Sequence, residues 1–404
     1  MDRTDRLPEV KRNLPDEAPS AEEGQDLTRR RWRAPDRPKR SLLVTGGAGF
    51  IGANFVHYWL DRYPGDRLVV LDALTYAGNL KSLEIAIENP RLRFVHGDIR
   101  NQKLVESLLI EEALDTIVHF AAESHVDRSI SGPDAFFDVN VIGTHSLLKA
   151  ARSVWLESGK PTEHRFHHIS TDEVYGDLGV ADPAFSEDNP YAPNSPYAAS
   201  KAAADHAVRA YWKTYGLRTT ISNCSNNYGP FHYPEKLIPL AIVNLLHGKK
   251  IPIYGDGSNV RNWLFVTDHC RGIERILEGG AVGRTYNLAG QSEKANLALI
   301  EELCQLTDEI FTEAPELLKQ FPGAWPALGR SCREAIEFVA DRPGHDRRYA
   351  IDSTRAHHEL GFTPEITFEE GLLRTVRWYL DHTQWWLSIM DGTYRQWIEG
   401  QYGH

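Results

Sequence analysis

Short apolar runs alternate with helical stretches from Ser41 onward, and this alternation restricts the fold more than any other feature of the sequence. The apolar runs have the length of buried strands and lie at Ser41–Thr45, Arg67–Leu71, Leu92–His96, Thr116–Phe120 and Arg165–Ser170. Helical patterns separate them at 50–63, 79–88, 101–113 and 134–157. Strands that alternate with helices form βαβ units with right-handed crossovers, which cover both faces of a parallel sheet. We therefore expect an α/β chain with a doubly wound parallel sheet.

A glycine-rich turn joins the first expected strand to the first expected helix. Its spacing, Gly46-x-x-Gly49-x-x-Gly52, permits a tight turn and a close approach of the backbone to a pyrophosphate. The N-terminus of the following helix offers free N–H groups and the positive end of its dipole to phosphates. Asp72 ends the second strand, where its carboxylate can bond the adenosine ribose hydroxyls and would repel a 2′-phosphate. The sequence therefore predicts a Rossmann domain that binds NAD rather than NADP.

Further cofactor contacts are expected at the carboxyl ends of the strands, because ligands of open α/β sheets bind at that edge. Asp98 follows the third strand, at a place suited to the adenine. Small residues follow the fourth strand, where a cofactor can lie against the backbone. The contacts expected along this edge are Gly46, Gly49, Phe50, Ile51, Gly52, Asp72, Ala73, Leu74, Thr75, Asp98, Ile99, Phe120, Ala121, Ala122 and Glu123.

The composition changes at two points of the chain. Residues 1–40 are rich in Arg, Asp, Glu and Pro, a composition that cannot offset the entropy of ordering, so we expect a disordered N-terminal extension. Residues 41–225 fit the NAD-binding Rossmann domain, with part of 258–290 returning to it. Prolines and short elements predominate beyond this point, and 226–404 is expected to form mainly a smaller C-terminal α/β domain that binds the substrate.

Charge and cysteine usage exclude several classes of protein. The net charge of −11 over 404 residues argues against nonspecific binding to nucleic acid or to an anionic membrane. No apolar run approaches the roughly 20 residues of a membrane helix, and residues 1–40 hold no apolar signal segment. The four cysteines are scattered, and His125 and Asp127 have no third ligand nearby. We expect a cytoplasmic protein with reduced thiols and no metal.

Two further motifs carry acid–base chemistry. Tyr197 and Lys201 are one helical turn apart, and we expect the ammonium to lower the pKa of the phenol. The strand that ends at Ser170 leads directly into Thr171, Asp172 and Glu173. Neighbouring carboxyls can hold opposite protonation states, because like charges disfavour double ionisation. This pair therefore supplies one general acid and one general base.

Together these motifs resemble the extended short-chain dehydrogenase/reductase family, whose members act on nucleotide sugars. The stretches most similar to its 4,6-dehydratases are Ala121–Ile130, Ile169–Leu178, Asn223–Pro239 and Asp341–Asp352. The resemblance covers about residues 41–390, apart from a long segment near 313–335. It implies a lyase that converts dTDP-glucose to dTDP-4-keto-6-deoxyglucose and water with bound NAD. A dehydratase of a UDP- or CDP-sugar and a nucleotide-sugar 4-epimerase are the alternatives. An epimerase needs only the Tyr–Lys pair and a small hydroxylated residue, so the two carboxyls argue against it.

The chemistry of such an elimination assigns a role to each residue. Tyr197 takes the proton of the C4 hydroxyl while NAD takes the C4 hydride, and Thr171 bonds the C4 oxygen. Lys201 holds the phenolate and bonds the nicotinamide ribose. Glu173 then removes the C5 proton, Asp172 protonates the departing C6 hydroxyl, and the hydride returns to C6.

A sugar diphosphate also needs fixed cations, for which Arg261 and Arg342 are the candidates because guanidinium groups suit bidentate phosphate contacts. The resemblance implies that Tyr197, Lys201 and Asn226 also contact NAD. It further implies substrate contacts from Ser124, Thr171, Asn226, Lys236, Leu237, Pro252, Ile253, Tyr254, Asn296 and His345. It also implies a homodimer formed by the helices near 134–157 and 196–215. The first of these helices carries more apolar residues than one sheet face obviously covers.

Overall fold

The computed structural model describes residues 37–158 and 163–390, and the described residues from Lys39 to Met390 belong to one compact unit. Most of the extension that we expected to be disordered lies outside the described residues. The five strands and the helix at 50–63 that the sequence predicts are confirmed, with their ends displaced by at most one residue.

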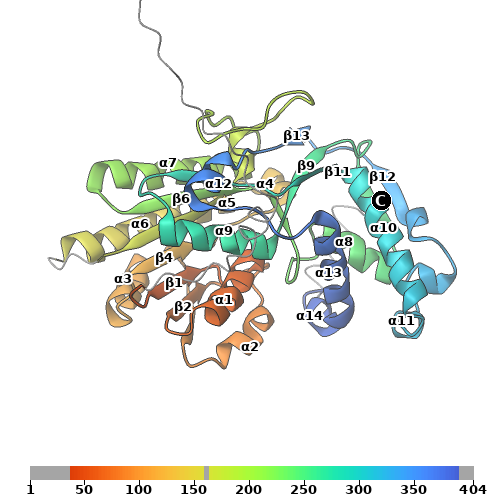
Figure 1. Ribbon diagram of the computed structural model, residues 1–404, viewed down its shortest axis with the longest axis horizontal. Helices are drawn as coiled ribbons and strands as arrows, with labels where there is room; N and C mark the ends of the chain where they lie inside the picture. The colour runs from red at the N-terminus through yellow and green to blue at the C-terminus, as the bar shows by residue number, and fades with distance from the viewer. Residues whose placement is uncertain (1–36, 159–162, 391–404) are drawn as a thin grey trace, which may run out of the picture. The chain divides into compact units, whose positions relative to one another are not determined.

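A central sheet of seven parallel strands has the order β10-β6-β5-β4-β1-β2-β3 (Figure 1). Its strands are β1 (Ser41–Thr45), β2 (Arg67–Asp72), β3 (Leu92–His96), β4 (Thr116–His119), β5 (Arg165–Thr171), β6 (Thr219–Cys224) and β10 (Thr285–Leu288). The chain runs from β1 outward to β3 and then crosses back to β4. The strand order therefore reverses between β1 and β4, which is where open α/β sheets bind their ligands.

Helices cover both faces of this sheet, as the alternating pattern predicts. Apolar side chains of α3 (Gln102–Glu111), α6 (Thr144–Arg152) and α7 (Pro196–Tyr215) share one buried cluster with the sheet residues Leu43 and Ile117. On the opposite face, α1 (Phe50–Arg62) and α9 (Val266–Gly279) lie side by side (Figure 1). Shorter elements complete this part of the chain: η2 (Leu80–Leu83), α2 (Glu84–Ile87), α4 (Val126–Ser131), η5 (Asp172–Tyr175) and α12 (Thr354–Leu360).

The long helix expected at 134–157 is helical throughout, but two of its turns are widened. It consists of α5 (Asp134–Phe136), the π-helical η3 (Phe137–Gly143), α6, and the π-helical η4 (Ser153–Glu157). Such turns are frequent at functional sites. Here the first one contains Asn140, whose amide bonds both backbone groups of Glu123 in the loop after β4, at 2.8 and 2.9 Å. The widened turn thereby fixes a loop at the ligand-binding edge of the sheet.

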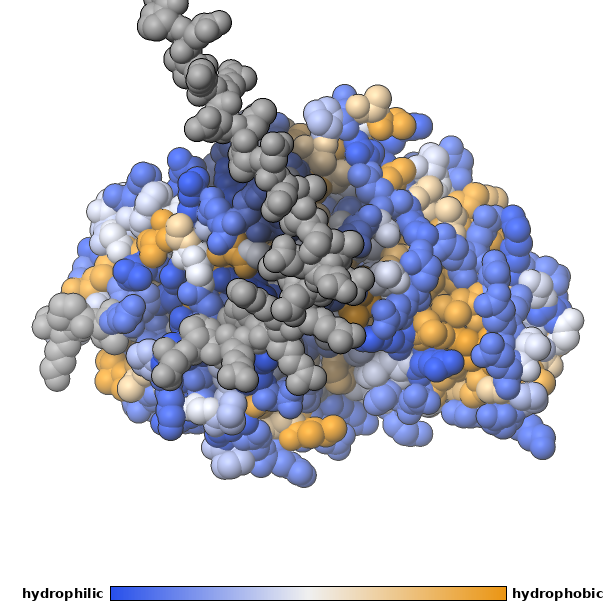
Figure 2. Space-filling view, in the orientation of Figure 1, coloured by the Kyte–Doolittle hydropathy of each residue, from blue (hydrophilic) through white to orange (hydrophobic). Residues whose placement is uncertain are grey.

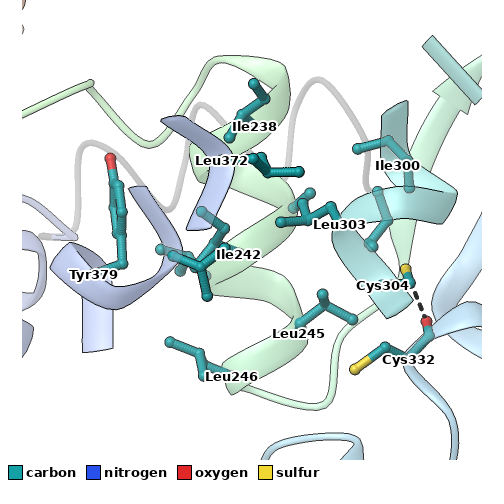
Figure 3. Close-up of a cluster of buried hydrophobic side chains, with 14 of the residues drawn as sticks. Ile238, Ile242, Leu245, Leu246, Ile300, Leu303, Cys304, Cys332, Leu372 and Tyr379 are labelled. Carbon is teal, nitrogen blue, oxygen red and sulfur yellow. Dashed lines mark hydrogen bonds between the residues drawn. The ribbon is translucent and has the colours of Figure 1, made fainter. Parts of the chain in front are cut away.

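The second half of the chain builds two small sheets and a helical core. The sheets contain β7 (Asn226–Tyr228), β9 (Val260–Phe265), β11 (Ser292–Ala295) and β13 (Arg348–Tyr349), and β8 (Ile251–Tyr254) with β12 (Ile336–Val339). The helical elements are α8 (Leu237–Leu246), α10 (Asn296–Glu313), α11 (Leu317–Gln320), η6 (Pro326–Leu328), η7 (Cys332–Ala335), α13 (Phe368–Asp381) and α14 (Thr383–Leu387). Figure 3 shows Ile242, Leu303 and Leu372 of three different helices packed together in this core.

We propose that the chain divides into two domains near residue 225. This core of α8, α10 and α13 is separate from the cluster beneath the central sheet, which supports the division. The segment that contains α9 and β10 belongs to the first part, because α9 packs on α1 and β10 extends the central sheet beside β6.

Apolar residues form separate patches within a largely hydrophilic surface on the face shown in Figure 2. Within residues 37–158 and 163–390, no helix combines the length and apolar character needed to cross a membrane.

Candidate active site

A cavity of about 380 Å³ opens at the carboxyl ends of the central strands. Its walls come from the glycine turn, the loops after β2, β3 and β4, the start of η5, the N-terminal part of α7 and the segment from β6 to α8. The structure therefore brings together residues as distant in the sequence as Gly46 and Trp263. The predicted site residues that line the cavity are Gly46, Gly49, Phe50, Ile51, Gly52, Asp72, Ala73, Thr75, Asp98, Ile99, Phe120, Ala121, Ala122, Glu123, Ser124, Thr171, Asp172, Glu173, Tyr197, Lys201, Asn226, Lys236 and Leu237.

The glycine turn is packed too closely for side chains. Gly46 has a φ of +70°, and a Cβ there would lie 2.6 Å from the backbone nitrogen of Ala121. A Cβ on Gly52 would lie 2.2 Å from the carbonyl oxygen of Gly46. Helix α1 begins directly after this turn, and neither a capping side chain nor an acidic residue occupies its first turn. Its N–H groups are therefore available to an anion such as a pyrophosphate.

Asp72 ties the end of β2 to the two loops beside it. Its carboxylate accepts hydrogen bonds from the backbone N–H groups of Ala48, at 2.9 Å, and Leu74, at 2.8 Å. Burial raises the pKa of Asp72, and the two hydrogen bonds oppose that effect. Leu74 itself does not line the cavity; its backbone acts by holding this carboxylate. Asp98 is more exposed, and hydrogen bonding to Arg100 lowers its pKa.

Three consecutive residues at the end of β5 form the acid–base group. The Thr171 hydroxyl accepts a hydrogen bond from the backbone N–H of Glu173 and donates one to Asp172, each at 3.3 Å. Burial and the neighbouring Glu173 charge raise the pKa of Asp172 to about 8. Burial also raises the pKa of Glu173, and the positive charge of Arg342 opposes this. One oxygen of each carboxyl is buried without a protein partner, so both can serve a ligand.

Tyr197 and Lys201 lie one turn apart near the start of α7, as predicted, but the expected effect of the lysine on the tyrosine is wrong. Burial and the charge of Glu173 raise the pKa of Tyr197 well above its usual value. The Lys201 ammonium is directed elsewhere, because its Nζ donates to the carbonyl oxygen of Ile169 at 2.7 Å. Burial lowers the pKa of Lys201 to about 8.

The predicted substrate residues fall into two groups. Ser124, Asn226, Lys236 and Leu237 line the cavity together with Thr171, and the Lys236 ammonium donates to the carbonyl of Ser124 at 2.8 Å. The second group does not line it and consists of Pro252, Ile253, Tyr254, Arg261, Asn296, Arg342 and His345.

Two residues of this second group, Tyr254 and Arg342, bond Asp127. The Asp127 carboxylate accepts hydrogen bonds from Arg342, at 2.9 Å, and from the Tyr254 hydroxyl, at 3.2 Å, while the His345 ring packs edge-on against Tyr254. Ile253 is 1% exposed and its side chain belongs to the helical core, so only its backbone could reach a substrate.

Arg261 is held more firmly than the sequence indicates. Its guanidinium donates to the carbonyl oxygens of Val260 and Asp346, at 2.8 and 2.9 Å, and lies 4.2 Å from the centre of the Tyr349 ring. Arg261 and Arg342 both lower the pKa of Glu173, so their charges act on the acid–base group from outside the cavity wall.

Sequence reasoning missed several residues of the site. Asn140 donates to the Ser200 hydroxyl at 2.9 Å as well as to Glu123, and its spacing from other motifs gives no signal. His232 lines the cavity and stacks on Phe50, with ring centres 4.1 Å apart, and its Nδ1 atom is buried without a partner. The stretch Asn223–Pro239, which carries much of the family resemblance, contains His232 and could have drawn attention to it.

Among residues 37–158 and 163–390, no three His, Cys, Asp or Glu side chains are grouped as metal ligands. The cysteines of the chain are free and buried: Cys224, Cys270, Cys304 and Cys332.

Comparison with known proteins assigns the chain to a family. The model of the GDP-mannose 4,6 dehydratase family matches residues 43–375. The chain belongs to this family. A dTDP-glucose 4,6-dehydratase from Neisseria meningitidis serogroup B is 49% identical over 358 residues, which cover 88% of this chain and 98% of the relative. Another from Xanthomonas campestris pv. campestris strain B100 is 51% identical over 355 residues, or 87% of this chain and 97% of the relative.

The solved structures agree with this assignment. A crystal structure of a dTDP-glucose 4,6-dehydratase from Streptomyces venezuelae with NAD bound has a TM-score of 0.77 at 46% identity, and covers 86% of this chain and 99% of its own. The predicted resemblance to nucleotide-sugar 4,6-dehydratases and the predicted doubly wound fold are therefore both confirmed.

Proposed function

We propose that this protein converts dTDP-glucose to dTDP-4-keto-6-deoxyglucose and water as an NAD-dependent hydro-lyase. The observation that carries the proposal is the position of Asp172 and Glu173, two carboxyls with raised pKa values in the cavity that also contains Tyr197 and the glycine turn. An elimination needs this additional acid and base, whereas a 4-epimerase does not. The names of the relatives support dTDP-glucose as the substrate.

The residues present fit NAD. The N–H groups at the start of α1 would hold the pyrophosphate, and the fixed carboxylate of Asp72 would accept from the adenosine ribose hydroxyls. Lys201 and Tyr197 would lie at the nicotinamide ribose. When bound, NAD accepts the C4 hydride and later returns it to C6, and the positive charge of its oxidised ring favours the ionised form of Tyr197.

Tyr197 and Thr171 would act on the C4 hydroxyl group. Because burial raises the pKa of Tyr197, its phenolate is a strong base for the C4 hydroxyl proton. The Thr171 hydroxyl lowers the pKa of Tyr197 by hydrogen bonding, so it partly offsets the effect of burial.

Glu173 and Asp172 would then act as the base and the acid of the elimination. A ketone at C4 acidifies the C5–H bond, and the unpartnered Glu173 oxygen can take that proton. Asp172, with a pKa of about 8, is protonated at neutral pH and can donate to the C6 hydroxyl as it leaves as water.

The reaction leaves Tyr197 with an extra proton and Asp172 without the proton that it donated. In each turnover Tyr197 gains the C4 hydroxyl proton and Asp172 loses one to the departing water, while Glu173 receives the C5 proton and gives it back. One proton must therefore pass from Tyr197 to Asp172 before the next turnover. The Thr171 hydroxyl bonds both groups and offers a direct path between them.

The test is an assay of the purified protein with dTDP-, UDP- and CDP-glucose and no added cofactor. We expect dTDP-glucose to give a product lighter by one water, and the other two sugars to react more slowly. A product of unchanged mass would indicate an epimerase instead. Strict dependence on added NADP would contradict the role of Asp72.

We also propose that the protein is a homodimer in the cytoplasm. Free buried cysteines are typical of a reducing compartment. Many of the apolar side chains of the helix at 134–157 that we expected to meet a partner are instead buried within the protomer, including Phe136 and Leu147. Phe137 and Ile142 on η3 and Tyr215 on α7 stay exposed, and these provide the apolar surface for a partner.

A further inference from the structure

The buried ammonium of Lys201 needs a negative partner that the mechanism does not supply. Lys201 is 4% exposed, and the acceptor nearest its ammonium is the neutral carbonyl oxygen of Ile169, at 2.7 Å. An isolated charge is costly in such surroundings, so buried charges are normally paired. Asp172 and Glu173 have little effect here, because the carboxylate that raises the pKa of Lys201 is Asp205.

Asp205 lies one turn beyond Lys201 on α7 and is 2% exposed. Residues four apart on a helix have neighbouring side chains. One Asp205 oxygen accepts from the Ser170 hydroxyl at 2.8 Å. The other lies 3.2 Å from His168 Nε2, and the same nitrogen lies 3.4 Å from Lys201 Nζ. The imidazole of His168 thus stands between the ammonium and the carboxylate.

His168 supplies no negative charge to balance the Lys201 ammonium. Burial and the charge of Lys201 lower its pKa far below the usual value, so the ring is neutral. If its proton is on Nδ1, Nε2 accepts from Lys201; if its proton is on Nε2, the N–H lies 3.2 Å from Asp205 Oδ1 without the alignment of a hydrogen bond. In both forms the carboxylate is the only negative group of this trio.

The other titratable groups around the trio leave this conclusion unchanged. Those facing Lys201 and Asp205 are His119 on β4, Cys224 on β6, Tyr175 on η5, Tyr191 in the loop before α7, and Tyr197 and His206 on α7. Burial keeps His119 neutral and raises the pKa of the Cys224 thiol to about 12, and the pKa values of the three tyrosines are also raised. These histidine, cysteine and tyrosine side chains therefore supply no negative charge near neutral pH.

We propose that Asp205 is a positioning residue for Lys201: its carboxylate, acting across His168, keeps the lysine an ammonium directed at the end of β5. The proposal deepens the proposed function and rests on it, because Lys201 is assigned there to the nicotinamide ribose. It explains why a carboxylate is buried behind the site without lining the cavity.

The charges of the pair define a pH window. Burial and the pairing with Lys201 leave Asp205 with a pKa of about 6, and Lys201 with one of about 8. Both groups are therefore charged between about pH 6 and pH 8. Removal of the carboxylate lowers the pKa of Lys201, so the ammonium loses its proton at a lower pH.

The test isolates the first chemical step. In a Glu173→Gln background with bound NAD, the rate of NADH formation in a single turnover is measured from pH 6 to pH 9.5. The rate should fall at alkaline pH as Lys201 loses its proton, and we call this fall the alkaline limb of the pH–rate profile. Adding Asp205→Asn should move the midpoint of this limb to lower pH by about one unit, since an opposite charge at this range typically shifts a pKa by about 1–3 units. The loss in rate should then be about 5-fold greater at pH 8.5 than at pH 6.5. Asp205→Glu should restore the original limb.

The matched control is Asp268→Asn. Asp268 is a carboxylate of α9 that is 1% exposed and accepts from the backbone N–H groups of Glu365 and Ile366, away from the site. This variant should lose stability but keep the midpoint of the limb. Asp205→Ser also removes the carboxylate but leaves a small polar side chain, so it should move the limb in the same direction, and it serves if Asp205→Asn does not fold.

An unmoved midpoint in Asp205→Asn, or in Asp205→Ser where the first does not fold, would overturn the proposal even if the overall rate fell. Failure of the proposed function is a separate result, since the protein with native Glu173 would then release no water from dTDP-glucose at any pH.

Discussion

At the scale of single residues, the site depends on how differently two adjacent carboxyls are surrounded. Asp172 is 3% exposed and feels the charge of Glu173, which together with burial keeps it protonated near neutral pH. Glu173 feels the positive charges of Arg342 and Lys236, which favour its ionised form. One sequence motif therefore supplies an acid and a base side by side.

Replacing either carboxyl should block one proton transfer of the elimination and leave the other possible. Glu173→Gln cannot accept the C5 proton, so elimination should slow on the order of 10²–10⁴-fold while NADH still forms. Asp172→Asn loses the acid for the departing hydroxyl but keeps the base, so its C5–H should exchange with solvent faster than in Glu173→Gln. NADH absorbance and deuterium uptake at C5 in a single turnover measure both effects.

Tyr197→Phe is the control for these variants, because it blocks the first step and should show neither NADH nor exchange. If Glu173→Gln exchanged C5–H at the unmodified rate, Glu173 would not be the base.

At the scale of elements, the cofactor site is the junction between β1 and α1. Backbone atoms approach so closely there that side chains are excluded, as at Gly52, where a Cβ would meet the Gly46 carbonyl oxygen at 2.2 Å. The turn before α1 is thereby placed against the end of β4, next to Ala121. The geometry that admits a pyrophosphate is set by backbone packing rather than by particular side chains.

Gly52→Ala should therefore displace the turn and weaken NAD binding at least about 10-fold, so that the purified protein contains far less nucleotide. Bound nucleotide is measured by absorbance and by mass after denaturation. Gly279→Ala is the matched control: the nearest atom to its Cβ is a methyl carbon of Leu360 at 3.5 Å, an ordinary contact at the end of α9. Full retention of NAD in Gly52→Ala would refute this account of the turn.

Local elements were easier to predict than the contacts between them. The β1–α1–β2 pattern and the Tyr197–Lys201 pair depend on periodicity and spacing, which the sequence displays directly. The direction of the Lys201 ammonium depends on Ile169, His168 and Asp205, and their arrangement follows from how α7 packs on β5. For that reason the expected effect on Tyr197 was wrong although the pair itself was found.

At the scale of the whole molecule, the acid–base group lies where the two halves of the chain meet. Thr171 and Tyr197 come from the central sheet and α7, whereas Arg261 and Arg342 come from beyond residue 225 and act on Glu173. The need of a diphosphate for fixed cations predicted these arginines, but their anchoring to backbone carbonyls and to Asp127 could not be predicted, since it depends on long-range packing.

The proposed dimer has a direct test at this scale. Ile142 is 54% exposed on η3, and Ile142→Glu should place a charge in the apolar contact and give monomers at micromolar concentration in sedimentation. Ile85→Glu is the control, because Ile85 is 81% exposed on α2, outside the proposed interface. A protein without substitutions that sediments as a monomer would contradict the dimer.

The most direct test of the central claim follows the hydrogen at C4. The protein, with no added cofactor, is incubated with dTDP-glucose that carries deuterium at C4, and the product is examined by mass spectrometry and NMR. We predict that the product is lighter by one water and carries the deuterium in its C6 methyl group, because the bound NAD returns the hydride it removed. A product that keeps the water, or one whose C6 methyl group lacks the deuterium, would contradict the account.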